Sequence, residues 1–400
     1  MKAIILAAGE GKRMRPLTYT RPKVMLTIAN RPILEHLLLE IKAAGIDEFV
    51  FVVGYHGETI QEYFGHGERW GVRIDYAIQR NQLGTAHALK TLEGKANGQF
   101  LLLNGDILIR EKYLKRLLSR KGIVLSVMEV VNPNGLGVVE TANDRVIRVE
   151  EKVKNPRSRL ANVGVYLFTA DVFEAVSQTP KSSRGEYEIT DSIQWLIDQG
   201  HEVFFERVDW WLSFTYPWDL LKANELLLRE MEPKNLGTVE ENVTLRGPIF
   251  IGKGSVIRAN SYIVGPVSIG ENCEIGPNCY IRPGTSIGDN CHIGSAVEIK
   301  NSIIMRGTKI PHHNYVGDSV IGEGCNLGAG TKVANLRLDE ANVVADGIET
   351  GRRKLGVIIG DGVRTGINAC LNPGTLIGSH AYIGPGAVVS GTVLPNSRIF

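Results

Sequence analysis

A short stretch near the start of the chain, LAAGEGKRMRP, combines glycines with basic residues. Gly9 and Gly11 let the backbone approach a phosphate closely, and Lys12, Arg13 and Arg15 can neutralise a triphosphate. The spacing is neither the dinucleotide-binding GxGxxG nor a Walker loop, so a glycine turn with solvated basic residues is the alternative. The stretch is a candidate nucleotide-phosphate loop.

Asp106 is a candidate metal ligand because it ends the apolar run FLLLNGD. A carboxylate at the end of a buried strand suits Mg²⁺, which keeps several waters and bridges phosphates. The alternative role for this side chain is to cap the N-terminus of a helix.

Two histidines, His312 and His313, lie together in IPHHNYVGDS, and Tyr315, Asn326 and Asn335 follow shortly after. Histidine is the side chain best suited to act as a general base near neutral pH. A histidine on the surface of a repeat is otherwise usually inert. These two stand where the repeat of the second half breaks, and broken regularity marks candidate functional sites.

The first half of the chain alternates strand-like runs with helical patterns. The runs are AIILAAG, FVFVVGY, FLLLNGD, IVLSVMEVV and NVGVYLFT, and ILEHLLLEIKAAG has a helical pattern. Such alternation predicts an α/β, Rossmann-like fold with a mostly parallel sheet between helices. Ligands are then expected at the carboxyl ends of the strands, where the glycine-rich stretch and Asp106 fall.

The second half carries a six-residue repeat of aliphatic side chains. Isoleucine stands at 251, 257, 263, 269, 275, 281, 287, 293 and 299, and the period resumes over 359–389 after a slip between Lys309 and Lys332. A period of six fits a triangular coil whose sides are hexapeptides, with inward ladders of aliphatic side chains. The non-repeating stretch Asn335 to Lys354 is expected to form an arm thrown out from one coil.

These patterns divide the chain into a first domain, 1–232, a linker, 233–242, and a β-helix domain, 243–400. The net charge of +2 indicates no nucleic-acid or membrane partner, and no apolar run reaches the roughly 18 residues of a membrane helix, so a cytoplasmic protein is expected. Three of the five cysteines follow the repeat period, which favours stacked structural thiols over zinc ligands.

The stretch LAAGEGKRMRPLTYTRPKVM resembles the signature of the sugar-1-phosphate nucleotidyltransferase family, and the resemblance extends over nearly the whole first half. It implies that Lys23 and Arg13 stabilise the charge that develops as pyrophosphate leaves. It also implies a nucleotide site and a sugar-phosphate site. The first comprises Leu6, Ala7, Ala8, Gly9, Glu10, Gly11, Lys12, Arg13, Gln79, Gly84 and Thr85, and the second Gly137, Glu150 or Glu151, Lys152 and Asn162.

The second half resembles the acetyltransferase domain of the archaeal bifunctional glucosamine-1-phosphate acetyltransferase/N-acetylglucosamine-1-phosphate uridylyltransferase family, whose domain is a left-handed parallel β-helix. The PHHNYVGD segment matches the family's catalytic-base motif through His312, while His313 does not match. The resemblance implies acetyl-CoA, UTP or dTTP and Mg²⁺ as co-substrates and cofactor, and a homotrimer. Its sugar-phosphate or acetyl-CoA site comprises Arg282, Lys300, Tyr315, Asn326, Asn335 and Lys354. Arg352 and Arg353 could serve phosphates or form a solvated charge run.

One departure from the family pattern concerns the metal site. Many relatives carry an aspartate in a WxDIGxPW-like segment, whereas this chain has WWLSFTYPWD, with Ser213 in place of the aspartate and Thr215 in place of the glycine. Metal affinity is therefore in question. Two alternative functions remain: a glucose-1-phosphate thymidylyl- or uridylyltransferase with a non-catalytic β-helix, and a non-enzymatic assembly module on a degenerate nucleotide-binding domain.

Overall fold

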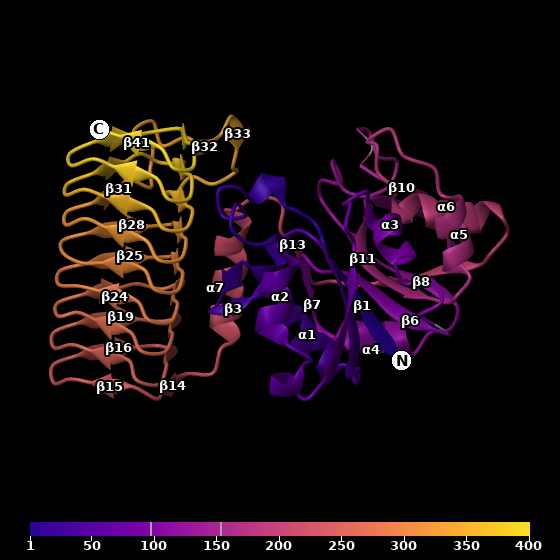
Figure 1. Cartoon of the computed structure of the whole chain (residues 1–400), viewed down its shortest axis with the longest axis horizontal. Coiled ribbons are helices and arrows are strands. Elements are labelled where there is room, and N and C mark those ends of the chain that lie inside the picture. Colours follow the sequence, from indigo (N-terminus) through magenta and orange to yellow (C-terminus); the bar gives the residue numbers. More distant parts are fainter. Residues whose placement is uncertain (97, 153) are drawn as a thin grey trace. The chain divides into compact units, whose positions relative to one another are not determined.

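The computed structural model describes residues 1–96, 98–152 and 154–400 and divides into two compact units. The first unit comprises Met1–Glu10 and Ile33–Ser213, and the second comprises Gly11–Pro32 and Phe214–Phe400. Figure 1 shows a sheet with helices in the first and a β-helix in the second. Over the described residues, no helix is long and apolar enough to cross a membrane.

The first unit contains a nine-stranded sheet in the order β5-β4-β1-β6-β11-β8-β12-β10-β9. Its strands are β1 (Lys2–Ala7), β4 (Glu48–Val53), β5 (Arg73–Ile78), β6 (Phe100–Asn104), β8 (Ile123–Glu129), β9 (Val138–Ala142), β10 (Arg145–Glu150), β11 (Leu160–Phe168) and β12 (Val203–Arg207). β5, β4, β1 and β6 are parallel, as expected. β11 runs antiparallel to both β6 and β8, so the sheet is more mixed than the alternating pattern predicted.

Helices and one small ribbon accompany this sheet. The helices are α1 (Ile33–Ala43), α2 (Gly57–Phe64), α3 (Thr85–Lys90), α4 (Glu111–Leu118), α5 (Val172–Gln178) and α6 (Ile189–Asp198), and the ribbon pairs β7 (Ile107–Ile109) with β13 (Trp211–Ser213). The helical pattern predicted around α1 is confirmed. Ile33, Leu34, Leu37, Leu38 and Ile41 recur at helical spacing, and each is fully buried.

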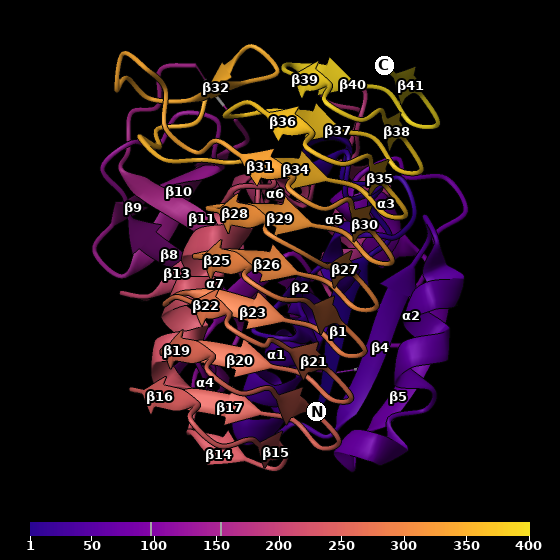
Figure 2. The same ribbon diagram turned by 90° about the vertical axis from the view of Figure 1, so that its left-hand side faces the viewer.

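The β-helix of the second unit has three faces of stacked parallel strands (Figure 2). The first face holds β14 (Lys234–Asn235), β17 (Ile249–Ile251), β20 (Val267–Ile269), β23 (Thr285–Ile287), β26 (Ile303–Ile304), β29 (Val320–Ile321), β34 (Ile358–Ile359), β37 (Leu376–Ile377) and β40 (Thr392–Val393). The second holds β15 (Thr238–Val239), β18 (Val256–Ile257), β21 (Glu274–Ile275), β24 (His292–Ile293), β27 (Lys309–Ile310), β30 (Asn326–Leu327), β35 (Arg364–Thr365), β38 (Tyr382–Ile383) and β41 (Arg398–Ile399). The third holds β16 (Thr244–Arg246), β19 (Tyr262–Val264), β22 (Tyr280–Ile281), β25 (Glu298–Lys300), β28 (Tyr315–Gly317), β31 (Lys332–Val333), β36 (Cys370–Leu371) and β39 (Val388–Val389).

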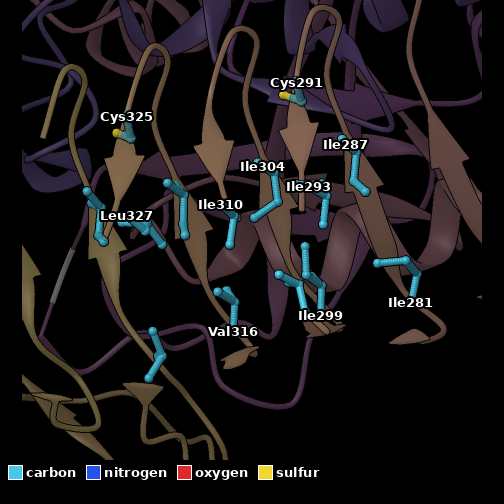
Figure 3. Close-up of a cluster of buried hydrophobic side chains, with 14 of the residues drawn as sticks. Ile281, Ile287, Cys291, Ile293, Ile299, Ile304, Ile310, Val316, Cys325 and Leu327 are labelled. Atoms are coloured by element: carbon cyan, nitrogen blue, oxygen red, sulfur yellow. The ribbon is translucent and has the colours of Figure 1, made fainter. Parts of the chain in front are cut away.

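The inward ladder of aliphatic side chains is continuous through the region where the sequence period slips (Figure 3). Ile304 follows Ile299 by five residues rather than six, and Ile321 follows Val316 by five, yet all four side chains are at most 1% exposed. Two coils are therefore one residue short, and each shortening falls at the corner between the third and first faces.

The predicted arm leaves the β-helix after β31. Its two ends are joined by an antiparallel bridge between Leu336 and Lys354, and the backbone N–H of Leu355 donates to the carbonyl of Asn335 at 3.0 Å. Its tip is the hairpin of β32 (Val344–Ala345) and β33 (Ile348–Glu349). At the other end of the β-helix, β14 and β15 lie within the segment predicted as the linker, so the first coil starts at Lys234.

The remaining elements of the second unit come from two distant parts of the sequence. They are 3₁₀ turns at Lys12–Met14 and Lys23–Met25, the hairpin of β2 (Thr27–Ile28) and β3 (Arg31–Pro32), and helix α7 (Asp219–Glu230). Helix α7 runs beside the first face of the β-helix (Figure 1).

Candidate active sites

The first half of the glycine-rich stretch leaves the carboxyl end of β1, in the middle of the parallel strands. The carbonyl of Leu6 accepts from the N–H of Gly105 at 2.9 Å, and the carbonyl of Ala8 accepts from the N–H of Tyr55 at 3.1 Å. A Cβ on Gly54 would come within 2.9 Å of the Ala8 carbonyl, so that position needs glycine. Ala7 and Ala8 are buried, whereas Gly9 is exposed and Glu10 half-buried. The strand ends thus present the backbone of this loop at the expected edge of the sheet.

Gln79 follows β5 at the same edge and is 3% exposed. Its Nε2 donates to the carbonyl of Gly84 at 3.0 Å and lies 2.9 Å from Nδ1 of His87. Both amide hydrogens are therefore engaged, and the side-chain carbonyl oxygen is the acceptor that remains on this amide. That oxygen can accept a hydrogen bond from the imino N–H of a pyrimidine.

Gly84 and Thr85 hold the segment after Gln79 in place. Gly84 has φ +115°, and a Cβ there would lie 2.4 Å from the carbonyl oxygen of Tyr187. Only glycine fits this position, because it has no Cβ to make that clash. The Thr85 hydroxyl accepts from the N–H of Ile189 at 2.9 Å. Both residues therefore fix the local backbone against the segment before α6.

Asp106 lies between β6 and β7 and is half-buried. Ser213 pairs with Ile107, the residue that follows Asp106, because β13 is antiparallel to β7. Ser213 thus occupies the position beside Asp106 at which relatives were expected to supply a second carboxylate. Over the described part of the chain, no three His, Cys, Asp or Glu side chains are grouped as a metal site.

The predicted sugar-phosphate residues cluster where β9, β10 and β11 meet. A Cβ on Gly137 would lie 2.9 Å from Oε2 of Glu151, and the Gly137 carbonyl accepts from the N–H of Asn162 at 2.8 Å. Nζ of Lys152 lies 3.4 Å from Oε1 of Glu151. Glu151 thus faces Gly137 and Lys152 together.

Glu150 has a different environment from its neighbour Glu151. Its carboxylate pairs with the exposed Arg148 at 2.6 Å, on the same strand. The two glutamates, which the sequence left undistinguished, have different partners, since Glu150 is the last residue of β10 and Glu151 lies in the bend that follows.

Two further charged residues belong to this cluster, Arg184 and Glu188, and neither was predicted from the sequence. Nη1 of Arg184 lies 3.5 Å from Oε1 of Glu151 and 3.1 Å from Oε1 of Glu188. Burial raises the pKa of Glu188, which is only 5% exposed at its side chain, and the charge of Arg184 opposes that rise. The signal available was the charged run RGEYE immediately before α6.

The second half of the glycine-rich stretch belongs to the second unit. Gly11 has φ +67°, and a Cβ on it would lie 2.8 Å from the Cβ of Lys23, so the two backbones pack closely. The Thr18 hydroxyl donates to the Gly11 carbonyl at 3.0 Å. Lys12 and Arg13 are exposed on the 3₁₀ turn that follows. The structure therefore brings Lys23 to the turn that carries the predicted phosphate ligands.

Asp219, at the start of α7, is a buried acid in the same unit. Its Oδ2 accepts from the N–H groups of Thr215 and Tyr216, each at 2.8 Å. Burial raises the pKa of Asp219, and the charges of Lys23 and Arg352 oppose that rise. Arg352, at the end of the arm, therefore acts electrostatically on the same acid as Lys23.

A polar cluster forms at the shortened corner of the β-helix. Oδ2 of Asp318 accepts from Nζ of Lys300 at 3.0 Å and from Nδ2 of Asn335 at 2.5 Å. The same Nδ2 lies 3.3 Å from the hydroxyl of Tyr315. Three successive coils thus contribute Lys300, Asp318 and Asn335 to one corner. Asp318, at 3% exposed, was missed from the sequence, although it is the aspartate of the PHHNYVGD motif.

Arg282 lies one coil before Lys300 in the same column, since Ile281 pairs with Ile299. Its guanidinium pairs with Glu298 at 2.9 Å. Burial raises the pKa of Tyr315, and the charges of Asp318 and Glu298 add to the rise, so the phenol stays a hydrogen-bond donor near neutral pH.

The predicted catalytic base lies at a different corner from this cluster. His312 and His313 are exposed between β27 and β28, and the His312 carbonyl accepts from the N–H of Gly330 at 2.9 Å. Asn326 lies on β30 of the second face, so the structure does not place it with Tyr315 and Asn335. Lys354 is exposed at the root of the arm, opposite Leu336.

Comparisons with known proteins agree with this division of the chain. The Nucleotidyl transferase family model matches residues 2–230, a model of the GMPPB C-terminal domain matches 263–355, and a model of six bacterial transferase hexapeptide repeats matches 356–391. The hexapeptide match agrees with the predicted left-handed β-helix.

Curated relatives align with the chain from end to end. The bifunctional protein GlmU of Methanocaldococcus jannaschii is 40% identical, over 100% of this chain and 97% of its own. The bifunctional sugar-1-phosphate nucleotidylyltransferase/acetyltransferase of Sulfurisphaera tokodaii is 39% identical, over 98% and 97%. A crystal structure of a putative glucose-1-phosphate thymidylyltransferase from Bacillus anthracis, in complex with a sucrose, is 29% identical with a TM-score of 0.53, over 59% of this chain and 98% of that one.

The alignments with these relatives cover both the nucleotidyl transferase domain and the hexapeptide β-helix, in the same order along the chain. The chain therefore belongs to the family of archaeal bifunctional sugar-1-phosphate nucleotidylyltransferase/acetyltransferases.

Proposed function

We propose that this enzyme acetylates glucosamine 1-phosphate with acetyl-CoA and then joins the product to UMP from UTP, releasing pyrophosphate. The observation that carries the proposal is the polar cluster of Lys300, Asp318, Asn335 and Tyr315 in a β-helix whose chain also bears a nucleotide loop. A β-helix used only for assembly needs no buried aspartate that collects donors from the coils on both sides of its own. The names of the full-length relatives support the same pair of reactions.

Acetyl transfer is proposed to occur on the β-helix. Arg282 and Lys300 supply positive charge for the sugar phosphate, and Tyr315 and Asn335 supply hydrogen bonds to the sugar. The amino nitrogen at C2 of the sugar attacks the thioester carbon while His312 removes a proton from it, and the thiolate of coenzyme A leaves. Lys354 and the neighbouring Arg352 and Arg353 lie at the arm root, and Arg353 pairs with Glu340.

Nucleotidyl transfer is proposed to need no covalent intermediate. A phosphate oxygen of the sugar 1-phosphate attacks the α-phosphorus of the nucleotide in line, and pyrophosphate departs. Lys12, Arg13 and Lys23 stabilise the negative charge of the leaving group. The free carbonyl oxygen of Gln79 suits the imino N–H of uracil or thymine, which supports a pyrimidine nucleotide.

The single carboxylate of Asp106 fits Mg²⁺, which binds through one or two carboxylates and otherwise through waters and substrate phosphates. The hydroxyl of Ser213, one residue pair away, adds a neutral oxygen. Mg²⁺ held there would neutralise charge on the nucleotide phosphates.

A homotrimer is proposed to form through the β-helix. Hexapeptide β-helices favour oligomerisation, and closed cyclic symmetry suits the repeated faces of this domain. His312 is exposed in the single chain, where an acetyl donor held by a neighbouring subunit could reach it.

A substrate panel tests the function directly. Purified enzyme is given glucosamine, galactosamine and glucose 1-phosphates, each with UTP or dTTP, with and without acetyl-CoA, while free thiol and pyrophosphate are measured. The expected result is thiol release with an amino sugar only, followed by pyrophosphate release with UTP. Pyrophosphate release from glucose 1-phosphate without any acetyl transfer would instead identify a plain thymidylyl- or uridylyltransferase.

A further inference from the structure

The segment that carries Lys23 belongs, by its contacts, to the β-helix unit. Residues 11–25 belong to the glycine-rich signature of the nucleotidyltransferase domain, yet residues 11–32 group with Phe214–Phe400. Two sets of polar contacts attach this segment to the β-helix, one on each side of Lys23.

We propose that Arg21, Glu323 and Asp361 are positioning residues for nucleotidyl transfer, through which the β-helix holds Lys23 in its reactive place. We call these three residues the Arg21 clamp. The proposal rests on the role proposed above for Lys23.

In the Arg21 clamp, the arginine lies two residues before Lys23 and the two carboxylates lie on the β-helix. Nη1 of Arg21 donates to Oε1 of Glu323, and Nη2 donates to Oδ2 of Asp361, each at 2.5 Å. The side chains of Arg21 and Asp361 are 12% and 13% exposed, so the ion pair is largely shielded from water. The hydroxyl of Thr20 donates to the same Oδ2 at 2.5 Å. One guanidinium thus bridges two carboxylates of successive coils, a geometry that lysine cannot reproduce.

The second attachment is the turn between β2 and β3, six to seven residues after Lys23. Ala29 and Asn30 both have positive φ, 46° and 63°, as a two-residue hairpin turn requires. Nδ2 of Asn30 donates to the hydroxyl of Ser268 at 3.0 Å and to the carbonyl of Ile287 at 2.9 Å. The hairpin tip is thereby bonded to β20 and β23 on the first face.

Helix α7 completes this second attachment through Asn224, which is fully buried. Its Oδ1 accepts from the N–H of Ala29 and from the hydroxyl of Ser286, each at 2.8 Å, and its Nδ2 donates to the carbonyl of Gly284 at 2.8 Å. One amide side chain therefore joins the hairpin tip to the β-helix.

Lys23 lies between these attachments and packs against Gly11. Because a Cβ on Gly11 would lie 2.8 Å from the Cβ of Lys23, a small shift of the segment also moves the backbone of the phosphate-binding turn. Lys23 acts on charge that develops in the transition state, so its displacement is expected to lower kcat more than it raises KM. Displacements of about 1 Å can cost roughly 100-fold in rate.

The test uses the full-length enzyme and both of its reactions. Asp361→Asn removes the ion pair while keeping an oxygen that can accept hydrogen bonds. The kcat of nucleotidyl transfer is expected to fall about 10- to 100-fold, as for other residues that orient a catalytic group, with a smaller change in KM for UTP. Acetyl transfer by the same β-helix is expected to stay within about twofold of wild type, because the clamp is not part of the proposed acetyl-transfer site.

Three further variants keep the test independent of one substitution. Glu323→Gln and Arg21→Ala are each expected to lower the same kcat, and Arg21→Lys is expected to recover part of the kcat that Arg21→Ala loses. Hydrogen exchange of the backbone over residues 18–30 is expected to rise in Asp361→Asn, since the segment is held less firmly.

Asp289→Asn is the matched control. Oδ1 of Asp289 accepts from the N–H of Glu271 at 2.7 Å, as Oδ1 of Asp361 accepts from the N–H of Glu323 at 2.8 Å. Both aspartates follow a strand of the first face, β23 and β34, and the contacts of Oδ2 with Arg21 and Thr20 distinguish Asp361. Equal effects of the two Asn variants, or a parallel loss of both reactions in Asp361→Asn, would overturn the proposal. A wild-type enzyme without nucleotidyl transfer would instead refute the proposed function.

Discussion

At the scale of single residues, the adjacent glutamates at the end of β10, Glu150 and Glu151, show how the direction of a side chain determines its role. Glu151 faces Gly137 and Lys152, whereas Glu150 pairs with Arg148, whose side chain is 49% exposed. A carboxylate directed into a polar cluster can hold a sugar hydroxyl. A carboxylate in a surface ion pair contributes about 0–1 kcal/mol.

We therefore expect Glu151→Gln to weaken nucleotidyl transfer and Glu150→Gln to leave it nearly unchanged. A hydrogen bond to a charged group is worth about 1.5–3 kcal/mol, which corresponds to roughly 10- to 100-fold in kcat/KM for the sugar 1-phosphate. Steady-state kinetics with N-acetylglucosamine 1-phosphate as the varied substrate measure the effect. A larger loss for Glu150→Gln than for Glu151→Gln would reverse the assignment.

Ser213 poses a second residue-scale question, about the metal. A carboxylate beside Asp106 would add a charged ligand for the metal. Ser213→Asp is therefore expected to lower the Mg²⁺ concentration that gives half-maximal activity, and an added charge near a divalent ion makes about a tenfold change reasonable. Ser213→Asn, similar in size but neutral, is the control and is expected to behave like wild type. If the Asp and Asn variants respond alike to Mg²⁺, this position does not contact the metal.

His312 and His313 give the residue-scale test of acetyl transfer. Removal of a general base lowers the rate of the catalysed step about 10²- to 10⁴-fold. His312→Ala is therefore expected to lower the kcat of acetyl transfer by that factor and to leave nucleotidyl transfer unchanged. His313 has φ +54°, and asparagine tolerates that conformation, so His313→Asn serves as the control with acetylation retained. Acetylation that survives in His312→Ala and fails in His313→Asn would assign the base to His313.

At the scale of elements, the hexapeptide ladder was predictable because one aliphatic side chain per six residues must be buried. Ile251 to Ile299 are each at most 1% exposed. A slip between Lys309 and Lys332 was predicted, and it contains the shortened corner after Val316 but not the one after Ile299. The ladder continues through both corners, and they bring Lys300, Asp318 and Asn335 together. A one-residue shortening moves a corner without changing what is buried.

Other elements could not be predicted from local patterns. β14 carries Lys234 and Asn235, both exposed, so the first coil has no inward ladder residue there to mark it. The Arg21 clamp joins residues separated by more than 300 positions, and no local periodicity reports such a pairing. The antiparallel direction of β11 likewise depends on a tertiary pairing rather than on its apolar composition.

The stacked cysteines give an element-scale prediction. Burial raises the pKa of Cys279 to about 11 and that of Cys325 to about 12, and it also raises the pKa values of Cys273 and Cys291. At pH 8 a thiol of pKa 11 is about 0.1% thiolate, and only the thiolate reacts. We expect iodoacetamide to label only Cys370, the exposed cysteine, in the native enzyme and all five cysteines after denaturation.

Mass spectrometry of proteolytic peptides measures this labelling, with Cys370→Ser as the control that should take up no label while native. Early labelling of Cys279 or Cys325 would mean that the coils open before the protein unfolds. Slow native labelling throughout would agree with a ladder closed along its whole length.

At the scale of the whole molecule, the chain joins two reactions whose order is set by their chemistry. Acetyl transfer consumes an amino sugar phosphate, and nucleotidyl transfer consumes its acetylated product. The residues proposed for acetyl transfer lie on the β-helix, and those proposed for the metal and the sugar phosphate lie on the sheet of the other unit. Damage to one site therefore leaves the other reaction chemically complete.

This separation predicts that two inactive variants complement each other in solution. His312→Ala cannot supply the acetylated sugar, and Asp106→Ala cannot attach the nucleotide, so neither alone should form the UDP-sugar from glucosamine 1-phosphate, acetyl-CoA and UTP. A mixture of the two is expected to form it after a lag in which the intermediate accumulates, because the intermediate diffuses between molecules. Anion-exchange chromatography of the nucleotide sugar follows the time course. The double variant His312→Ala/Asp106→Ala, mixed with either single variant, should form none, and a mixture without product would show that the intermediate is passed within one molecule.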